Sequence, residues 1–265
     1  MGPGGRPWTN KPFQHCKHCP ILTGTAPSFC YRCLVANAQV DDMAAERCPV
    51  CCHPESVAGD PCSNPLCSGY ADERRFGRAL AATTLSGDIG MMVHLLKPRD
   101  PDKAPKRHYA SVLGGFLAGW AMTHPDDLAG YDLVMPMPAH PDRVTEIGVD
   151  IPAVLVRCLQ RTLGQMEYVL KADEIATKSH RVEARSHGNS WQERREAVKD
   201  AYQVSPGSEA RLAGASVLVV DDVFTTGLNL DALAGELLAA GASDVDGLVV
   251  ARAIHDGGAR EGGVG

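Results

Sequence analysis

The sequence lacks the features that mark membrane proteins, secreted proteins and general nucleic-acid binders. Its most apolar stretch, residues 112–122, is too short to cross a bilayer and contains three glycines. The first ten residues, MGPGGRPWTN, contain no apolar signal-peptide core, and Arg6 stands where a myristoylation signal needs Ser or Thr. The formal charge of -6 gives no overall attraction for nucleic acid or an anionic membrane. We therefore expect a cytoplasmic protein with no membrane segment and no general nucleic-acid binding.

Cysteine is nearly absent from the last three quarters of the chain, where only Cys158 occurs. The other nine of the ten cysteines lie within the first 67 residues, in a segment poor in the apolar patterns that build a core. Such a segment needs disulfides or a metal ion to fold stably. We therefore expect a cysteine-rich module over residues 1–70, a second domain over residues 71–256 and a disordered tail over residues 257–265.

The spacing of the cysteines favours a metal over disulfides. Three Cys-x-x-Cys pairs occur, in CKHC, CYRC and CPVC, and a wider pair follows in CSNPLC. The Cys-x-x-Cys spacing lets two thiolates bind one tetrahedral ion. Because no secretory signal is present, structural Zn2+ is the preferred interpretation, with a disulfide framework or redox dithiols as alternatives. The predicted ligands are Cys16, Cys19, Cys30, Cys33, Cys48, Cys51, Cys62 and Cys67.

Eight thiolates predict two zinc sites of four ligands each. Pairing neighbours in sequence closes the shortest loops, so the first four ligands would form one site and the last four the other. A cross-braced pairing is the alternative, and Cys52 is left over or replaces Cys51. Closed four-cysteine sites have no open coordination position, so we expect the module to be structural or to bind a partner.

The remainder of the chain alternates helical and strand patterns. The expected helices cover residues 73–97, 108–124, 151–164 and 229–242. The expected strands cover residues 131–138, 167–173, 216–222 and 244–252. Residues 174–200 are polar and have no apolar face before Trp191, so we expect a mobile loop there. This alternation predicts an α/β fold in which a central parallel sheet is flanked by helices.

One stretch, VLVVDDVFTTG, places two acids directly after a buried strand and then turns through Thr-Thr-Gly. Ligands bind beyond the carboxyl ends of parallel strands, and the N-terminus of the next helix attracts an anion. Thr225, Thr226 and Gly227 could therefore hold a phosphate, with Asn229 capping the helix, while Asp221 and Asp222 accept sugar hydroxyls. A ribose 5-phosphate would suit both parts of this stretch, with its phosphate at the turn and its hydroxyls at the acids. Neither a Walker loop nor a Gly-x-Gly-x-x-Gly motif is present.

The same stretch resembles the phosphoribosyl-pyrophosphate (PRPP) motif of type I phosphoribosyltransferases. With the cysteine pairs ahead of it, the whole chain resembles the ComF family, zinc-bearing phosphoribosyltransferase-like proteins linked to natural competence and DNA uptake. HLLK, DLVMPMPAHPDR and RREAVKDAYQV lie where that family has its helix-end Lys, its pyrophosphate loop and its Arg-containing segment.

The resemblance implies a type I phosphoribosyltransferase fold and a site for PRPP with Mg2+. The 5-phosphate would bind Thr225, Thr226 and Gly227, and the ribose would bind Asp221 and Asp222. Residues 137–143, ending at Arg143, would form the pyrophosphate loop, and residues 171–195 would form a lid that excludes water. The activity would be transfer of phosphoribose to an unknown nitrogen acceptor.

The chain also departs from the family pattern. Where relatives have Arg-Gly-Phe-Asn, it has Ile147, Gly148, Val149 and Asp150, which removes a cation near the pyrophosphate. Arg143, Lys171 or Arg185 could compensate. Two hypotheses therefore stay open, a phosphoribosyltransferase and a catalytically silent PRPP-binding regulator that acts through protein partners in DNA uptake. A third hypothesis is that the zinc module contacts single-stranded DNA, but the balanced charge of the module gives this hypothesis little support.

Overall fold

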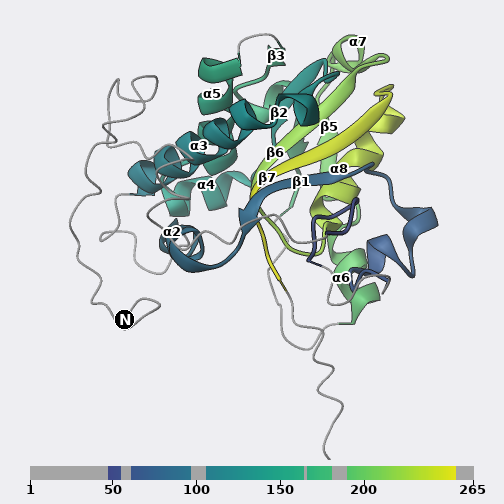
Figure 1. The fold of residues 1–265 in the computed structure, drawn as a ribbon. Helices are drawn as coiled ribbons and strands as arrows, with labels where there is room; N and C mark the ends of the chain where they lie inside the picture. The colour runs from purple at the N-terminus through teal and green to yellow at the C-terminus, as the bar shows by residue number, and fades with distance from the viewer. Residues whose placement is uncertain (1–46, 55–60, 97–105, 164–165, 181–189, 255–265) are drawn as a thin grey trace, which may run out of the picture.

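The computed structural model describes residues 47–54, 61–96, 106–163, 166–180 and 190–254 (Figure 1). The helices are α2 (Gly87–Leu96), α3 (Lys106–Thr123), α4 (Pro141–Ile147), α5 (Ile151–Leu163), α6 (Trp191–Val198), α7 (Glu209–Leu212) and α8 (Leu228–Ala239). The strands are β1 (Ala79–Thr84), β2 (Leu133–Pro136), β3 (Glu167–Tyr168), β4 (Ala176–Lys178), β5 (Tyr202–Val204), β6 (Ser216–Phe224) and β7 (Asp244–Arg252). Short 3-10 helices are η2 (Pro65–Cys67), η3 (Ala71–Glu73), η4 (Pro125–Leu128) and η5 (Ala172–Glu174).

A five-stranded parallel sheet in the order β1-β7-β6-β2-β3 forms the centre of the fold. The strands β4 and β5 form a separate antiparallel pair, with Lys178 opposite Tyr202. In Figure 1, α3 and α5 cover one face of the sheet and α8 covers the other. The predicted α/β class, a central parallel sheet flanked by helices, is confirmed.

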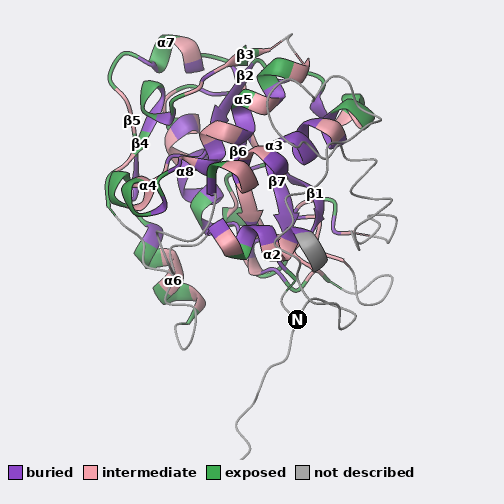
Figure 2. Cartoon of the chain, turned by 90° about the vertical axis from the view of Figure 1, so that its left-hand side faces the viewer, coloured by how far each residue is buried: buried purple, intermediate pink, exposed green. Residues whose placement is uncertain are grey.

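The strand β6 is buried on both faces, which explains its unbroken apolar run. Leu218 and Val220 pack with α3 and α5, whereas Val217 and Val219 pack in the core on the other side, with α8. A strand with this double burial has no polar face. Buried residues accordingly gather on the strands and on the helix faces turned toward them (Figure 2).

The prediction of one helix over residues 73–97 is wrong for the first half of that range. Residues Ala79–Thr84 form β1, which pairs in parallel with β7, and only Gly87–Leu96 are helical. The sequence ALAATT has strong helix formers, but all six residues are buried, and pairing with β7 satisfies their backbone. Tertiary packing therefore outweighs local propensity here. Lys97 lies outside the described residues, as does the tail over residues 257–265.

Two expected loops contain helices. Residues Pro141–Ile147 form α4, with His140 as N-cap, Pro141 in the first turn and Gly148 as left-handed C-cap. Residues Trp191–Val198 form α6, whose Ser190 and Glu193 make a reciprocal capping box. Residues 174–200 also contain β4, and residues 181–189 lie outside the described part. Pro, Gly and the Ser-x-x-Glu spacing were signals for both helices in the sequence.

The described part of the cysteine module packs directly on the sheet. Cys48, Cys51 and Leu66 belong to the same hydrophobic core as α8 and one face of β6. The backbone N-H of Ala79, at the start of β1, donates to the carbonyl of Val50 at 2.7 Å. The module and the sheet therefore share a core. None of the helices described here is long and apolar enough to span a bilayer.

Candidate functional site

The paired acids lie near the carboxyl end of β6, within the strand rather than after it. Asp221 is opposite Val249 of β7, and the strand continues to Phe224. Both acids are partly buried, and the Asp221 Oδ1 atom accepts the backbone N-H of Asp222 at 2.8 Å. The carboxylates thus stand at the edge of the sheet where α/β proteins bind ligands.

The turn of Thr225, Thr226 and Gly227 links β6 to α8. Gly227 has φ of 86°, and a Cβ atom there would lie 2.5 Å from the Phe224 ring, so only glycine fits. No hydrogen-bond acceptor is found, among the residues that the structure describes, for the backbone N-H groups of these three residues. Unpaired N-H groups at a helix N-terminus form a ready anion site.

Asn229 does not cap α8, contrary to expectation. The N-cap is Gly227, with no side-chain cap, and Asn229 is the second residue of the helix. Its Oδ1 atom instead accepts hydrogen bonds from the Tyr202 hydroxyl at 3.0 Å and from Lys178 Nζ at 3.2 Å. The left-handed glycine starts the helix without a side-chain cap, which frees Asn229 to face the cavity.

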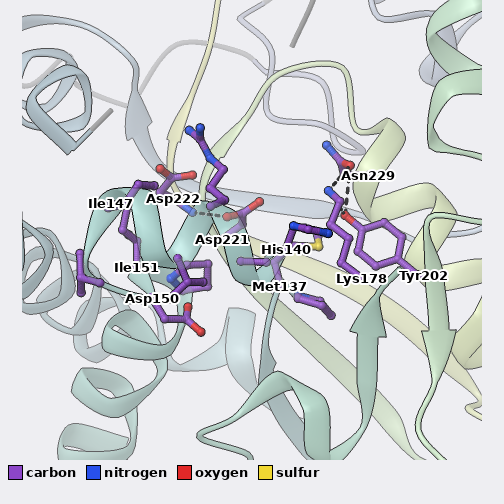
Figure 3. Close-up of a pocket in the computed structure, with 16 residues that line it drawn as sticks. Met137, His140, Ile147, Asp150, Ile151, Lys178, Tyr202, Asp221, Asp222 and Asn229 are labelled. Carbon is purple, nitrogen blue, oxygen red and sulfur yellow. Dashed lines mark hydrogen bonds between the residues drawn. The ribbon is translucent and has the colours of Figure 1, made fainter. Parts of the chain in front are cut away.

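A cavity of about 200 Å3 opens beside the acids (Figure 3). Its lining comes from the loop after β2, from α4, from the start of α5, from β4 and β5, and from the two acids. A smaller cavity of about 40 Å3 touches Thr225 and Gly227 and shares Met137, Asp221 and Asn229 with the larger one. The acids and the turn therefore face adjoining spaces.

Lys178 is a cavity residue that the sequence did not indicate. Its Nζ atom donates to the Tyr202 hydroxyl at 3.0 Å, and the two residues are paired across β4 and β5. Tyr202 is only 2% exposed, yet its hydroxyl joins this cluster. Nothing in the polar run around Lys178 sets it apart, because its position depends on the pairing of two short strands.

Burial and charge shift the pKa values in this cavity. Burial raises the pKa of the Asp221 carboxyl well above its usual range, the charge of Asp222 adds to the rise, and Lys178 opposes it. Burial lowers the pKa of the Lys178 ammonium, which Asp221 opposes and Arg143 reinforces. Partly buried charges of both signs in one cavity are typical of a binding site for a charged ligand.

The expected pyrophosphate loop is shorter than predicted. Residues 137–140 form the loop, whereas Pro141 and Arg143 belong to the first turn of α4. His140 Nδ1 accepts the N-H of Asp142 at 3.3 Å, and His140 and Arg143 both line the cavity. The helix begins early because Pro141 cannot extend the preceding strand but suits a first helical turn.

Ile147, Val149 and Asp150, which stand where the resemblance implies Arg, Phe and Asn, line the cavity wall. Ile147 and Val149 are buried, at 8% and 7% exposure. Asp150 Oδ1 accepts the N-H of Ala153 at 3.1 Å at the start of α5, and burial raises the pKa of this carboxyl. Among the proposed substitute cations, Arg143 lines the cavity, Lys171 does not, and Arg185 lies outside the described residues.

Residues 171–195, the expected lid, are described only at their two ends. Lys178 lines the cavity, but Arg195 turns elsewhere, with Nη1 2.6 Å from the Glu73 carboxylate. The lid itself remains a prediction.

Four cysteines gather on the other side of the turn. The Sγ atoms of Cys48, Cys51, Cys62 and Cys67 all lie within 4.8 Å of one another. Cys51 Sγ and Cys62 Sγ are 3.6 Å apart, close to the separation of about 3.8 Å that tetrahedral Zn-S bonds of about 2.3 Å require. The four are free thiols, and the Asn64 N-H lies 3.5 Å from Cys62 Sγ. The donor set and spacing therefore fit one Zn2+ ion.

This cluster has the composition expected from pairing sequence neighbours. Cys52 is not part of it, so Cys51 keeps its predicted place. Burial raises the pKa of the Cys52 thiol, which keeps it in the neutral form. Cys16, Cys19, Cys30 and Cys33 lie outside the described residues, and the second zinc site stays a prediction.

Similarity to known proteins is found in structure and not in sequence. No protein-family model and no curated protein matches the sequence. Similar solved structures include an allosteric regulatory enzyme of purine biosynthesis and a glutamine PRPP amidotransferase from B. subtilis complexed with ADP and GMP, each with a TM-score of 0.36 and 18% identity. Both matches cover 60% of this chain and 30% of the other. A hypoxanthine phosphoribosyltransferase from Staphylococcus aureus gives a TM-score of 0.32 at 12% identity, covering 58% of this chain and 68% of the other.

Proposed function

We propose that the protein binds PRPP, or a related ribose 5-phosphate, in the cavity at the end of β6. One observation carries this proposal: at one edge of a parallel sheet, adjoining cavities are lined by two carboxylates and by a turn whose backbone N-H groups have no acceptor among the described residues. The unpaired N-H groups of the turn would hold the 5-phosphate, and Asp221 and Asp222 would accept the ribose hydroxyls. The class of protein that this arrangement suits best is a phosphoribosyltransferase or a protein derived from one.

The negatively charged pyrophosphate of PRPP needs cations. Arg143 and Lys178 line the cavity and would supply two of them. The two aspartates also offer the oxygen ligands that Mg2+ prefers, and Mg2+ commonly takes its remaining ligands from substrate phosphates and water. When bound, Mg2+ would stabilise charge on the departing pyrophosphate.

The proposed reaction is displacement at C1 of the ribose. The C1-O bond to pyrophosphate breaks and its electron pair leaves with the pyrophosphate, while a nitrogen lone pair forms the new C1-N bond and the nitrogen releases a proton. Such a reaction depends on positioning and charge stabilisation more than on a protein nucleophile. Asp221 and Asp222 would orient the ribose, and the apolar wall of Ile147 and Val149 would help to exclude water.

Within this class we propose a ComF-type protein, on the strength of the PRPP motif and the cysteine pairs together. Its cellular role would then be in natural competence, through protein partners of DNA uptake in the cytoplasm. Deleting the gene in a naturally competent host should abolish transformation, and complementation should restore it. Normal transformation in the deletion strain would contradict this role without touching PRPP binding.

Calorimetric titration with PRPP and Mg2+ tests the binding site. Wild type should bind, and the double substitution Asp221→Asn with Asp222→Asn should reduce affinity at least tenfold, because two charge-assisted hydrogen bonds are lost. Asp244→Asn, at the opposite end of the neighbouring strand β7, is the matched control and should bind like wild type. Equal affinity in the double variant would reject the site.

A catalytically silent PRPP-binding protein is the second candidate. The apolar residues Ile147 and Val149 favour it, because they stand where the resemblance implies a cation and an aromatic ring. Release of pyrophosphate on mixing PRPP, Mg2+ and a panel of nitrogen acceptors would establish the enzyme. Tight binding of PRPP with no release across the panel would favour the silent protein.

A further inference from the structure

The last residue of β7, Arg252, connects the cysteine cluster to the turn of Thr225, Thr226 and Gly227. Its side chain is buried, at 2% exposure. Its Nε atom donates to the carbonyl of Cys51 at 2.9 Å, and its Nη1 atom donates to the carbonyls of Thr225 at 2.6 Å and Phe224 at 3.1 Å. Nη1 also donates to the carbonyl of Ala253. One guanidinium thus fixes a zinc ligand's backbone and the start of the turn together.

Asn64, between Cys62 and Cys67, makes a second connection. It is 5% exposed, and its Nδ2 atom donates to the carbonyl of Thr226 at 3.2 Å. Its Oδ1 atom accepts the N-H of Leu66 at 3.1 Å, which caps η2. The Leu66 side chain also lies 3.4 Å from the position of a Cβ at Gly227. The loop that carries two of the four cysteines therefore supports the turn from behind.

These contacts determine the direction of the N-H groups in the turn. In a trans peptide, the carbonyl of one residue and the N-H of the next point in opposite directions. The carbonyls of Phe224, Thr225 and Thr226 are all held by Arg252 or Asn64. The N-H groups of Thr225, Thr226 and Gly227 must then point away from the cysteine cluster, as a bound phosphate requires.

The charge of Arg252 gives the cluster a further role. A buried guanidinium is costly unless an anion balances it. No carboxylate of the described residues forms an ion pair with Arg252, whereas its Nη2 atom lies 3.9 Å from Cys51 Sγ. Four thiolates around one Zn2+ carry two net negative charges. The metal-loaded cluster is thus the anionic neighbour that this cation needs.

We propose that Asn64 and Arg252 are positioning residues that couple the four-cysteine zinc site to the sugar phosphate site. Zinc binding joins Cys48 and Cys51 to the segment Cys62–Cys67, and this segment, with Arg252, orients the N-H groups that bind the 5-phosphate. Coupling of this kind is reciprocal, so a bound sugar phosphate must also tighten zinc binding. The inference rests on the proposed function, because it assumes that the turn binds a phosphate.

The test uses the full chain loaded with zinc, and PRPP with Mg2+ as the probe. Zinc transfer to a chromophoric chelator is timed with and without PRPP, and PRPP affinity is measured by calorimetry. Asn64→Ser keeps a hydroxyl that can cap η2 but cannot reach Thr226. Ser68→Ala is the matched control, because it removes a 3.2 Å hydrogen bond to Asn64 O inside the same loop and leaves the turn untouched.

In wild type, PRPP should slow zinc transfer several-fold. Asn64→Ser should keep wild-type zinc content, bind PRPP about 3- to 10-fold more weakly, and lose most of the effect of PRPP on zinc transfer. Ser68→Ala should behave like wild type in all three measurements. A background with Cys16→Ser and Cys19→Ser removes the other predicted zinc site, so that the signal belongs to the cluster of Cys48, Cys51, Cys62 and Cys67.

Arg252→Lys is a second variant, since it keeps the buried charge but cannot reach Cys51 O and Thr225 O together. Arg252→Lys should weaken PRPP binding more than Asn64→Ser does. If the Arg252→Lys variant does not fold, the result for Asn64→Ser alone decides the test. Suppose that wild type binds PRPP, that Asn64→Ser binds it with the same affinity, and that PRPP does not change the rate of zinc transfer. These results together would overturn the coupling and leave the proposed function standing. Absence of PRPP binding in wild type would overturn both the coupling and the proposed function.

Discussion

Single residues in the cavity carry charge in partly buried surroundings, which proteins avoid unless a ligand uses the charge. Lys178 is the clearest case. Its ammonium is held by the Tyr202 hydroxyl and Asn229 Oδ1, and burial lowers its pKa. A phosphate ligand would add to the negative charge that Asp221 places near this ammonium.

Substituting Lys178 should therefore weaken binding of a phosphorylated ligand. Lys178→Met keeps the length of the side chain but removes the charge, and we expect PRPP affinity to fall about 10-fold or more. Calorimetry measures it. Lys199→Met is the control and should change affinity less than 2-fold. Lys199 is the exposed residue directly after α6, does not line the cavity, and pairs only with Glu196 among the ion pairs described. A wild-type affinity in Lys178→Met would show that Lys178 does not face the ligand.

Asp221 should make the folded state less stable at neutral pH than in acid. Its pKa in the folded state lies above that in the unfolded chain. The contribution of Asp221 to the free energy of unfolding is therefore most favourable below about pH 4, and this contribution is lost as the pH rises through the folded-state pKa. Asp221→Asn removes this loss. The variant should be more stable than wild type at pH 7 and should differ little from it at pH 4, as measured by urea unfolding at both pH values. A variant less stable than wild type at pH 7 would contradict this.

The junction of β6 and α8 is the element on which the site depends. Gly227 begins the helix with a left-handed backbone, and the Phe224 ring occupies the space of a Cβ. Further along α8, the buried Asp231 accepts hydrogen bonds from the backbone N-H and the side chain of Arg75, which anchors the helix to the segment before β1. The helix N-terminus is thus fixed from two sides.

Gly227→Ala should damage both stability and binding. The left-handed φ and the clash with Phe224 together should cost about 2 to 4 kcal/mol, and PRPP binding should be lost. Gly207→Ala is a matched control, because Gly207 has φ of 88° but nothing within 4 Å of its Cβ position. It should cost about 1 kcal/mol and leave binding unchanged. Urea unfolding and calorimetry of both variants separate backbone strain from the clash, and equal losses in the two would contradict the role of Phe224.

At the scale of the whole molecule, the cysteine module and the sheet are one packed unit in the described residues. Cys48, Cys51 and Leu66 share a core with α8 and β6, and Arg252 and Asn64 bridge the two parts. The division at residue 70 and the second zinc site remain predictions. A metal at the cluster should consequently stabilise more than its own loop.

Zinc removal should lower the thermal midpoint of the entire protein. We expect a fall on the order of 10 °C on chelation, reversed by adding Zn2+, because loss of the ion loosens a shared core. Cys51→Ser should lose one zinc per chain and show the same fall, whereas Cys52→Ser should keep full zinc content. Calorimetric scans with metal analysis measure both. An unchanged midpoint in zinc-free protein would show that the cluster is not part of the folding unit.

The sequence predicted the parts of the molecule whose signals are local. The apolar run of β6, its two acids and the Thr-Thr-Gly turn were recognisable because burial on both faces and the need for glycine act on neighbouring residues. The same holds for the last four-cysteine set, because short spacings in the sequence suffice to bring its four Sγ atoms within 4.8 Å of one another. The capping box at Ser190 and the Pro141 and Gly148 boundaries of α4 are equally local signals, and they mark both helices in the sequence.

Only the tertiary structure decided the features that depend on pairing between distant segments. Residues 79–84 have helical propensity, but pairing with β7 makes them a strand, and Lys178 enters the cavity only because β4 pairs with β5. Arg252 and Asn64 both reach the turn although they lie 188 positions apart in the sequence. No spacing in the sequence reports such contacts, because the free energy that selects them comes from burying side chains of distant segments together on the two faces of the sheet.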